Sequence, residues 1–206
     1  MFIFAHMGIT LGAATLVSGI IATCHRPDAK HKPETADSIQ NISEAKKSFP
    51  ERIGLASLAK FLDIRLLVLG SLFPDIIDKP LSFLGFGDGR SITHTLLITV
   101  IVLLASLIIF WRYKKTWLLA IAFGLLAHIV LDSMWTSPHT LLWPLYGWEF
   151  PAPDRSLNPI SFWWNILMTN PGVDISEAVG LVIILVFTGI LFFRRKLEAF
   201  ITKGEI

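Results

Sequence analysis

The chain has 206 residues, of which 53% are hydrophobic and 17% charged, and its mean hydropathy is +0.61. A soluble domain has about a quarter of its residues charged, so this composition excludes an ordinary soluble protein and predicts an integral membrane protein. The net charge of +2 gives no basis for nucleic-acid binding, and the single cysteine, Cys24, excludes a disulfide within the chain. The length suits one membrane-embedded helical domain covering residues 1–206.

The first apolar segment covers residues 1–24. A helix needs about 20 apolar residues to cross the hydrocarbon core, so this segment is long enough to span. It has no basic start and no small-residue cleavage site, which favours a retained helix over a cleaved signal peptide. The polar segment that follows, residues 25–52, is predicted to be a cytoplasmic loop.

The second apolar segment, residues 53–73, is harder to interpret because it contains Lys60, Asp63 and Arg65. One interpretation is a spanning helix whose charged side chains reach back to the interface. The other is an amphipathic helix that lies on the surface and then enters the bilayer. We favour the spanning helix.

Three further spans are predicted at residues 92–111, 116–134 and 178–193. The last is preceded by Asp174 and Glu177, whose spacing is typical of a helix N-terminus. Between the last two spans, residues 135–174 are rich in proline and hold five of the seven tryptophans, so we expect this segment to lie along the outer interface. The predicted fold is an all-α polytopic bundle of about five transmembrane helices.

The basic residues of the predicted loops are distributed unevenly. With five spans, one side holds thirteen lysines and arginines and the other only Lys79, Arg90 and Arg155. The positive-inside rule therefore predicts an external N-terminus and a cytoplasmic C-terminus in the cell membrane.

Six ionisable side chains fall at the predicted outer ends of four helices, and these are His6, Asp75, Asp78, His94, His128 and Asp132. Ionisable groups inside spans are costly, so each is a functional candidate. His128 and Asp132 are four residues apart and share a helix face. Imidazole together with carboxylate suits zinc, manganese or iron(II) better than calcium. The alternatives are structural: a hydrogen bond between helices for this pair, or a helix cap for Asp75. His139, seven residues beyond Asp132, is a further candidate.

Several motifs resemble the YdjM-like family of membrane-bound metal-dependent hydrolases. They are Gly-Ser-Leu-Phe-Pro-Asp-Ile-Ile-Asp-Lys-Pro at residues 70–80, Gly-Arg-Ser-Ile-Thr-His-Thr-Leu-Leu at 89–97, His-Ile-Val-Leu-Asp-Ser at 128–133 and Thr-Leu-Leu-Trp-Pro at 140–144, with His6 as the N-terminal histidine. Many relatives have Asp-x-Asp-His where this chain has an Asp-x-x-Asp-Lys run, so Asp75 matches more closely than Asp78. The residue order also resembles, more distantly, the zinc-dependent phospholipases C and single-strand nucleases.

The resemblance implies a hydrolase with a divalent metal, zinc first and manganese or iron as alternatives, held by the six side chains named above. It also implies a phosphoester substrate, which at head-group depth would be a lipid or lipid-linked molecule. Asp75, His94 and Asp132 are the expected catalytic residues, and Lys79 and Arg90 are expected to contact the substrate phosphate. The alternative for these two basic residues is ordinary anchoring at the interface.

A different class of function remains open, namely a metal transporter or a non-catalytic metal-binding membrane protein. Transporters place their ligands near the bilayer midplane and contain internal repeats. The candidate ligands here are biased towards one leaflet and no repeat is evident, which favours an enzyme.

Overall fold

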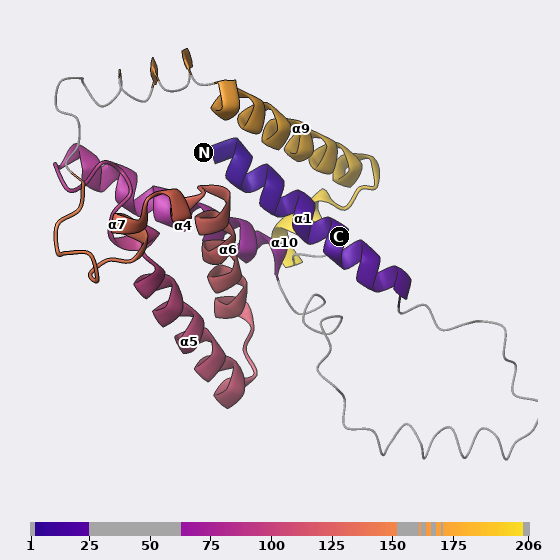
Figure 1. The fold of residues 1–206 in the computed structure, drawn as a ribbon. Coiled ribbons are helices and arrows are strands. Elements are labelled where there is room, and N and C mark those ends of the chain that lie inside the picture. The colour runs from indigo at the N-terminus through magenta and orange to yellow at the C-terminus, as the bar shows by residue number, and fades with distance from the viewer. Residues whose placement is uncertain are drawn as a thin grey trace, which may run out of the picture. The chain divides into compact units, whose positions relative to one another are not determined.

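The computed structural model describes residues 3–24, 63–151, 161, 164–165, 168–169 and 171–203, and these contain helices and turns but no strand (Figure 1). The predicted all-α class is therefore confirmed. The chain divides into two compact units, Met1–Ala14 with Leu62–Ile206, and Thr15–Phe61, and the site lies in the first. The predicted loop at residues 25–52 and the first ten residues of the predicted span at 53–73 lie outside the described residues.

Helix α4, Ile64–Phe83, begins after Asp63, whose carboxylate accepts the backbone N–H of Arg65 at 2.9 Å. The sequence predicts that this helix ends at Phe73, before Pro74, but it continues for ten more residues and contains Pro74 and Pro80. A proline disturbs the hydrogen bonds of the turn before it. The Ser71 carbonyl in that turn lies 2.6 Å from Nδ1 of His128.

Helix α6, Trp117–Leu131, packs closely on α4 through two glycines. A Cβ atom on Gly70 would overlap the backbone of Ile121, and one on Gly124 would overlap the Leu67 carbonyl. Small residues let helix backbones approach in this way inside membranes. The contact brings the middle of α4 next to His128.

Helix α5 covers Leu96–Tyr113 and also contacts α6, to which a short connection at residues 114–116 joins it. The sequence predicts a span from residue 92, but residues Ile92–His94 form a separate 3-10 turn, η1. The reason is Thr95, whose extended backbone starts the helix and whose side chain accepts the N–H of Ile98 at 3.3 Å. His94 therefore lies just before the helix rather than in its first turn.

The end of α6 also differs from the prediction. The helix ends at Leu131 rather than at residue 134, because Asp132 is its C-cap and Ser133 adopts a left-handed backbone conformation with φ of 52°. The turn η2, Met134–Thr136, and the short helix α7, Pro138–Leu141, follow.

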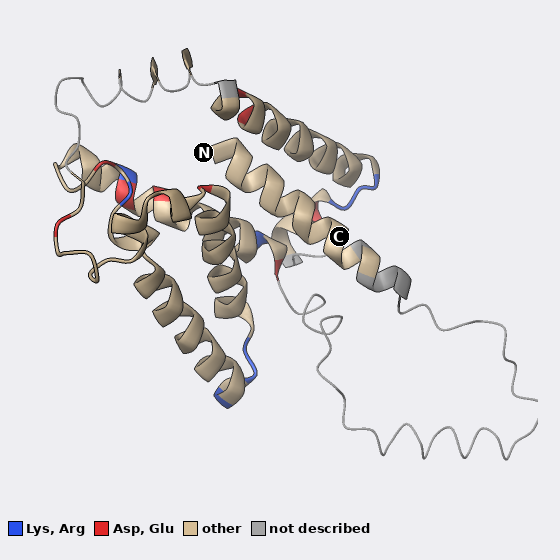
Figure 2. Ribbon diagram, in the orientation of Figure 1, with Lys and Arg blue, Asp and Glu red and all other residues tan. Residues whose placement is uncertain are grey.

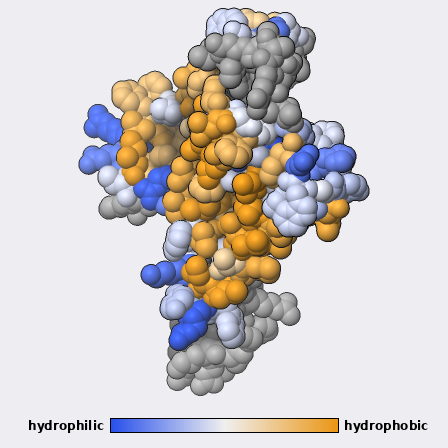
Figure 3. Space-filling view, turned by 90° about the vertical axis from the view of Figure 1, so that its left-hand side faces the viewer, coloured by the Kyte–Doolittle hydropathy of each residue, from blue (hydrophilic) through white to orange (hydrophobic). Residues whose placement is uncertain are grey.

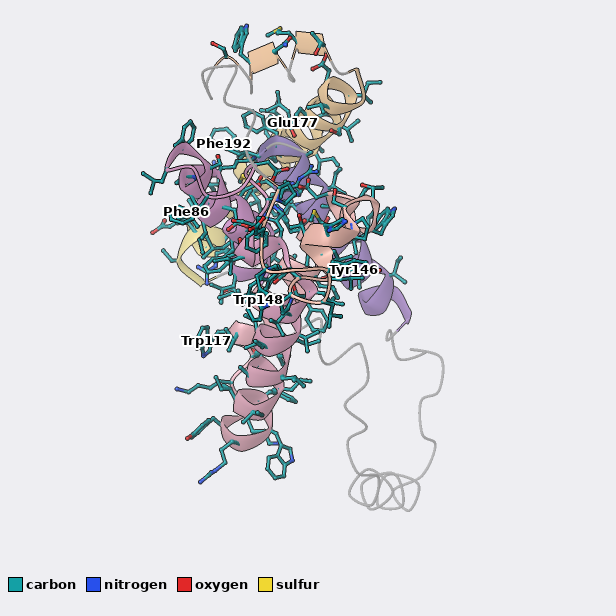
Figure 4. The ribbon with its side chains drawn as sticks, turned by 60° about the vertical axis from the view of Figure 1, so that its left-hand side comes forward. Phe86, Trp117, Tyr146, Trp148, Glu177 and Phe192 are labelled. Atoms are coloured by element: carbon teal, nitrogen blue, oxygen red, sulfur yellow. The ribbon has the colours of Figure 1, made fainter. Side chains whose placement is uncertain are left out.

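Helices α1, Ile3–Cys24, and α9, Pro171–Phe193, lie side by side (Figure 1). Gly8 and Gly180 are the contact point, where an added Cβ on either would overlap the backbone of the other helix. The sequence predicts that Asp174 and Glu177 cap a helix starting near Ala178. Instead α9 begins at Pro171, and Glu177 accepts the backbone N–H groups of Phe4 and Ala5 at 3.0 and 3.2 Å, capping α1 (Figure 4).

A short helix that the sequence did not predict, α10, Leu197–Lys203, follows α9. The guanidinium of Arg65 donates to the Ile201 carbonyl at 2.6 Å and so ties α10 to the start of α4. The basic tail is therefore partly helical.

Among the residues that the structure describes, two helices are long and apolar enough to cross a membrane, Leu96–Tyr113 and Gly172–Phe193, and Ile3–Ser18 and Trp117–Leu131 are shorter apolar helices. Large apolar side chains on α5 and α9 are exposed, among them Ile101, Leu104, Ile108, Leu185 and Val186. The space-filling view shows such apolar surface over much of one face (Figure 3), and the basic residues of the α5–α6 turn lie beyond the apolar helices (Figure 2). The count of about five spans stays a prediction.

Candidate metal centre

Three histidines and two aspartates meet in one buried cluster at the ends of the helices. They come from α1, α4, the turn before α5, and α6 with its C-cap: His6, Asp75, His94, His128 and Asp132. The three imidazoles are fully buried, and the two aspartates are 6 and 7% exposed. The structure thus brings together five of the six residues that the sequence predicts as ligands.

Two of these imidazoles are fixed in orientation by hydrogen bonds at Nδ1. His94 Nδ1 lies 2.8 Å from the Asp78 carboxylate, and His128 Nδ1 lies 2.6 Å from the Ser71 carbonyl. Both partners can only accept, so in the neutral rings each Nδ1 carries the proton. The Nε2 atoms are then both acceptors, yet they lie 3.0 Å apart. Two unprotonated nitrogens cannot bond to each other, so this contact is favourable only with a proton on one ring or a cation held by both.

The two carboxylates surround the same point. Asp75 Oδ1 lies 3.7 Å from His94 Nε2 and 4.0 Å from His128 Nε2. Asp132 Oδ2 lies 3.8 and 4.0 Å from the same two nitrogens. Donors that share one divalent ion stand about 3–4 Å from one another, since each lies about 2.0–2.3 Å from the ion. The donor types and their spacing therefore fit a transition-metal ion.

His6 approaches the cluster from the other side. Its Nε2 lies 3.2 Å from Asp132 Oδ1 and 3.9 Å from Asp75 Oδ2, and its ring stacks on His128 with centroids 4.1 Å apart. The contact with Asp132 has ion-pair distance but not hydrogen-bond geometry, and both ring nitrogens of His6 are buried without a hydrogen-bond partner among the described residues. Neutral imidazole is a common metal ligand, so His6 fits a metal site beside these carboxylates.

Asp78 occupies a different place from the other five side chains. Its carboxylate accepts the backbone N–H groups of Ser91 and Thr93, at 2.8 and 3.1 Å, and bonds His94 Nδ1. It lies behind His94, on the side away from the Nε2 atom. The sequence names Asp78 as a ligand, and this stays a prediction; in the structure its carboxylate contacts His94 Nδ1, a position that carboxylates next to metal-bound histidines commonly take.

The two predicted substrate contacts border the cluster. Lys79 Nζ lies 2.6 Å from Asp75 Oδ2, and Arg90 Nε lies 3.2 Å from Asp132 Oδ2. Their side chains are 20 and 37% exposed, against 6 and 3% for the carboxylates. Lys79 and Arg90 therefore lie between the buried carboxylates and the surface of the protein.

His139, the further candidate, is not brought into the cluster. It is exposed on α7, and its ring lies 5.4 Å from that of Tyr146. In the segment beyond α7, Trp143 contacts the rings of Trp148 and Phe150. The placement of residues 135–174 along the outer interface stays a prediction.

Two contributors to the site are missed by sequence reasoning. The Ser71 carbonyl is a backbone group, and the only feature of the sequence near it is Pro74, three residues later. Glu177 fixes the start of α1, and so the position of His6, from 172 residues away in the chain.

The fold and the cluster define a membrane protein of apolar helices with a buried histidine–aspartate site. The family model described as YdjM inner membrane protein matches residues 47–197, and the chain belongs to that family. The resemblance drawn from the motifs is thereby confirmed. No curated protein and no solved structure matches the chain. The likeness to zinc-dependent phospholipases C and nucleases stays a prediction.

Proposed function

We propose that the chain is a membrane-embedded metal-dependent hydrolase that cleaves a phosphoester of a lipid or lipid-linked substrate. The observation that carries the proposal is the pair of Nε2 atoms of His94 and His128, 3.0 Å apart and both acceptors. A proton alone would leave the neighbouring carboxylates and His6 unexplained. A divalent ion, with zinc as the first candidate and manganese or iron(II) as alternatives, suits this combination of imidazole and carboxylate donors.

The charges of the site support an anionic substrate. Asp75 and Asp132 carry two negative charges, which Lys79 and Arg90 balance within ion-pair distance. A bound divalent ion then leaves the site with a net positive charge. This positive charge would attract a phosphate group. At the rim of the site lies the guanidinium of Arg90, a group that can bind phosphate oxygens through two parallel hydrogen bonds.

When bound, the metal would lower the pKa of a water molecule towards neutrality and stabilise negative charge on the phosphate. The residues of the chain supply the rest. His94 and His128 hold their Nε2 atoms towards the ion because Asp78 and the Ser71 carbonyl fix their tautomers. One of the two carboxylates, Asp75 or Asp132, would accept the proton of the attacking water through a lone pair that does not hold metal, and would pass it to the leaving oxygen. Lys79 and Arg90 neutralise the phosphate oxygens as the ester bond breaks.

The test is hydrolysis by purified protein in lipid nanodiscs. Protein stripped by a chelator is assayed against phosphodiester and phospholipid substrates, before and after addition of Zn²⁺ or Mn²⁺. We expect activity that depends on the metal and is lost in the His128→Ala/Asp132→Ala double variant. Bound metal without hydrolysis of any phosphoester would contradict the proposal and favour a transporter or a non-catalytic metal protein.

A further inference from the structure

The two carboxylates of the cluster each direct their two oxygens to different imidazoles. Asp75 presents Oδ1 to His94 and His128, at 3.7 and 4.0 Å, and Oδ2 to His6, at 3.9 Å. Asp132 presents Oδ2 to His94 and His128, at 3.8 and 4.0 Å, and Oδ1 to His6, at 3.2 Å. The donors thus form two sets, one around His94 and His128 and one around His6, with both carboxylates in common.

One ion does not account for both sets. An ion bound by His94, His128, Asp75 Oδ1 and Asp132 Oδ2 has a full set of four donors, which is the usual number for zinc. It leaves the other oxygen of each carboxylate facing His6. It also leaves both nitrogens of His6 buried without a hydrogen-bond partner in the described part of the chain. Such groups are costly to bury and need an explanation.

His128 cannot belong to both sets of donors, because it cannot bind two ions at once. Two groups of possible ligands share this residue, His6 with Asp75 and His128, and His94 with His128 and Asp132. Nδ1 of His128 is committed to the Ser71 carbonyl, so only the single lone pair of Nε2 remains. One imidazole nitrogen binds one ion, whereas a carboxylate has an oxygen for each of two. The bridging groups must therefore be the aspartates.

We propose that the cluster holds two divalent ions bridged by Asp75 and Asp132, the first bound by His94 and His128 and the second by His6. This inference rests on the proposed metal-dependent function and extends it. The second ion has three protein donors, which leaves it open to water and substrate. Lys79 does not prevent this, because a carboxylate oxygen has two lone pairs and Asp75 Oδ2 can accept from the ammonium and also bind an ion.

Two bridged ions favour one class of substrate over others. Such pairs stabilise both the attacking and the leaving oxygen of an in-line displacement at phosphorus. The second ion also raises the positive charge of the site, which strengthens the preference for a phosphate group over a neutral ester. A two-ion centre would therefore favour a phosphoester over a carboxylic ester as the bond that is cleaved.

The experiment measures metal stoichiometry and magnetic coupling rather than activity. Full-length protein in detergent is stripped, loaded with Mn²⁺ and freed of excess metal. Elemental analysis then counts the ions per chain, and electron paramagnetic resonance distinguishes an exchange-coupled pair from an isolated ion. We expect two ions per chain and a coupled spectrum for the unaltered protein. In His6→Gln, we expect one ion and the spectrum of isolated Mn²⁺.

His139→Ala, which alters an exposed histidine outside the cluster, serves as the control and should retain both ions. One ion per chain in the unaltered protein, unchanged in His6→Gln, would overturn the two-ion centre while leaving a mononuclear hydrolase intact. An absence of bound metal would overturn both proposals. The measurement on the unaltered protein decides the nuclearity by itself, so a variant that fails to fold does not affect that result.

Discussion

His94 and His128 point their Nε2 atoms at each other across 3.0 Å, while Nδ1 of each ring is held by a group that can only accept. Helix α4 carries both acceptors and is in close contact with α6, which carries His128, at Gly70 and Gly124, while His94 lies in the turn η1. The fold thus brings two lone pairs to one buried point. Burial without compensation would be unfavourable, so a bound cation should stabilise the fold as well as supply chemistry.

The first prediction concerns His128. Replacing it with alanine removes one of the two facing nitrogens and leaves the Ser71 carbonyl without its donor. We expect the affinity for the ion at His94 and His128 to fall by at least about 10–100-fold, because even residues that only support a ligand change metal affinity by that factor. Titration with Zn²⁺ against a competing chelator measures it. His139→Ala is the matched control, and equal loss of affinity in both variants would argue against the cluster as the binding site.

The second prediction tests whether Asp78 orients a metal ligand or is itself a metal ligand. In Asp78→Asn the carboxylate that accepts from Ser91, Thr93 and His94 becomes a neutral amide. The proton on His94 Nδ1 is then held less firmly, and we expect metal affinity to fall about 10–100-fold without loss of stoichiometry at saturating metal. Titration with Zn²⁺ against a competing chelator measures this.

Asp174→Asn, which changes an exposed aspartate in the first turn of α9, is the control for the loss of one negative charge. If Asp78→Asn instead lowers the number of ions bound at saturation, Asp78 is itself a ligand. An affinity equal to that of the control would show that the bond to His94 has no influence on the site.

The third prediction tests how α1 is held. A Cβ atom on Gly180 would overlap the backbone of Phe4 and Ala5, whereas one on Gly189, further along the same helix, meets nothing within 4 Å. Gly180→Ala should therefore lower the free energy of unfolding by about 1–3 kcal/mol, as other overpacked positions do. Gly189→Ala should leave it unchanged or slightly raised, since alanine favours helix.

Thermal unfolding in detergent, followed by circular dichroism, compares the two variants. His6 follows Phe4 and Ala5 directly in α1. A displacement of these two residues in Gly180→Ala should therefore move His6 and weaken metal binding. Equal stability of the two alanine variants would mean that α1 and α9 do not pack through these glycines.

The sequence predicts some parts of this site well for physical reasons. Ionisable residues are scarce in apolar segments, so His6, Asp75, His94, His128 and Asp132 stand out without any structure, and the His128–Asp132 spacing places both near one helix end. Helix class and the apolar helices follow from length and hydropathy alone.

Other parts depend on contacts that are distant in the chain. The role of Asp78 is decided by the backbone of Ser91 and Thr93, and no spacing rule reveals that those N–H groups turn towards it. Glu177 has the pattern of a capping residue for its own helix, but the cap it forms belongs to α1. The contact between His128 Nδ1 and the Ser71 carbonyl likewise joins residues that are 57 positions apart in the chain.

The fourth prediction concerns the side of the membrane on which the site opens. Thirteen basic residues lie in the segments predicted to face the cytoplasm and three in those predicted to face outwards. We therefore expect a reporter enzyme fused at residue 40 to report the cytoplasm and one fused at residue 155 to report the exterior. The cluster would then lie at the outer leaflet, because Arg90 and Lys79 belong to the same side as residue 155.

Fusions at both positions reporting the same side would show that residues 53–73 do not span, since that segment determines whether the number of crossings is odd. The histidines and aspartates would still meet, because their distances do not depend on the membrane. The substrate would then have to reach them from the other leaflet or from the aqueous phase. An assay in lipid vesicles, with the phosphoester substrate placed either in one leaflet or in the aqueous phase, would identify the side from which the substrate reaches the site.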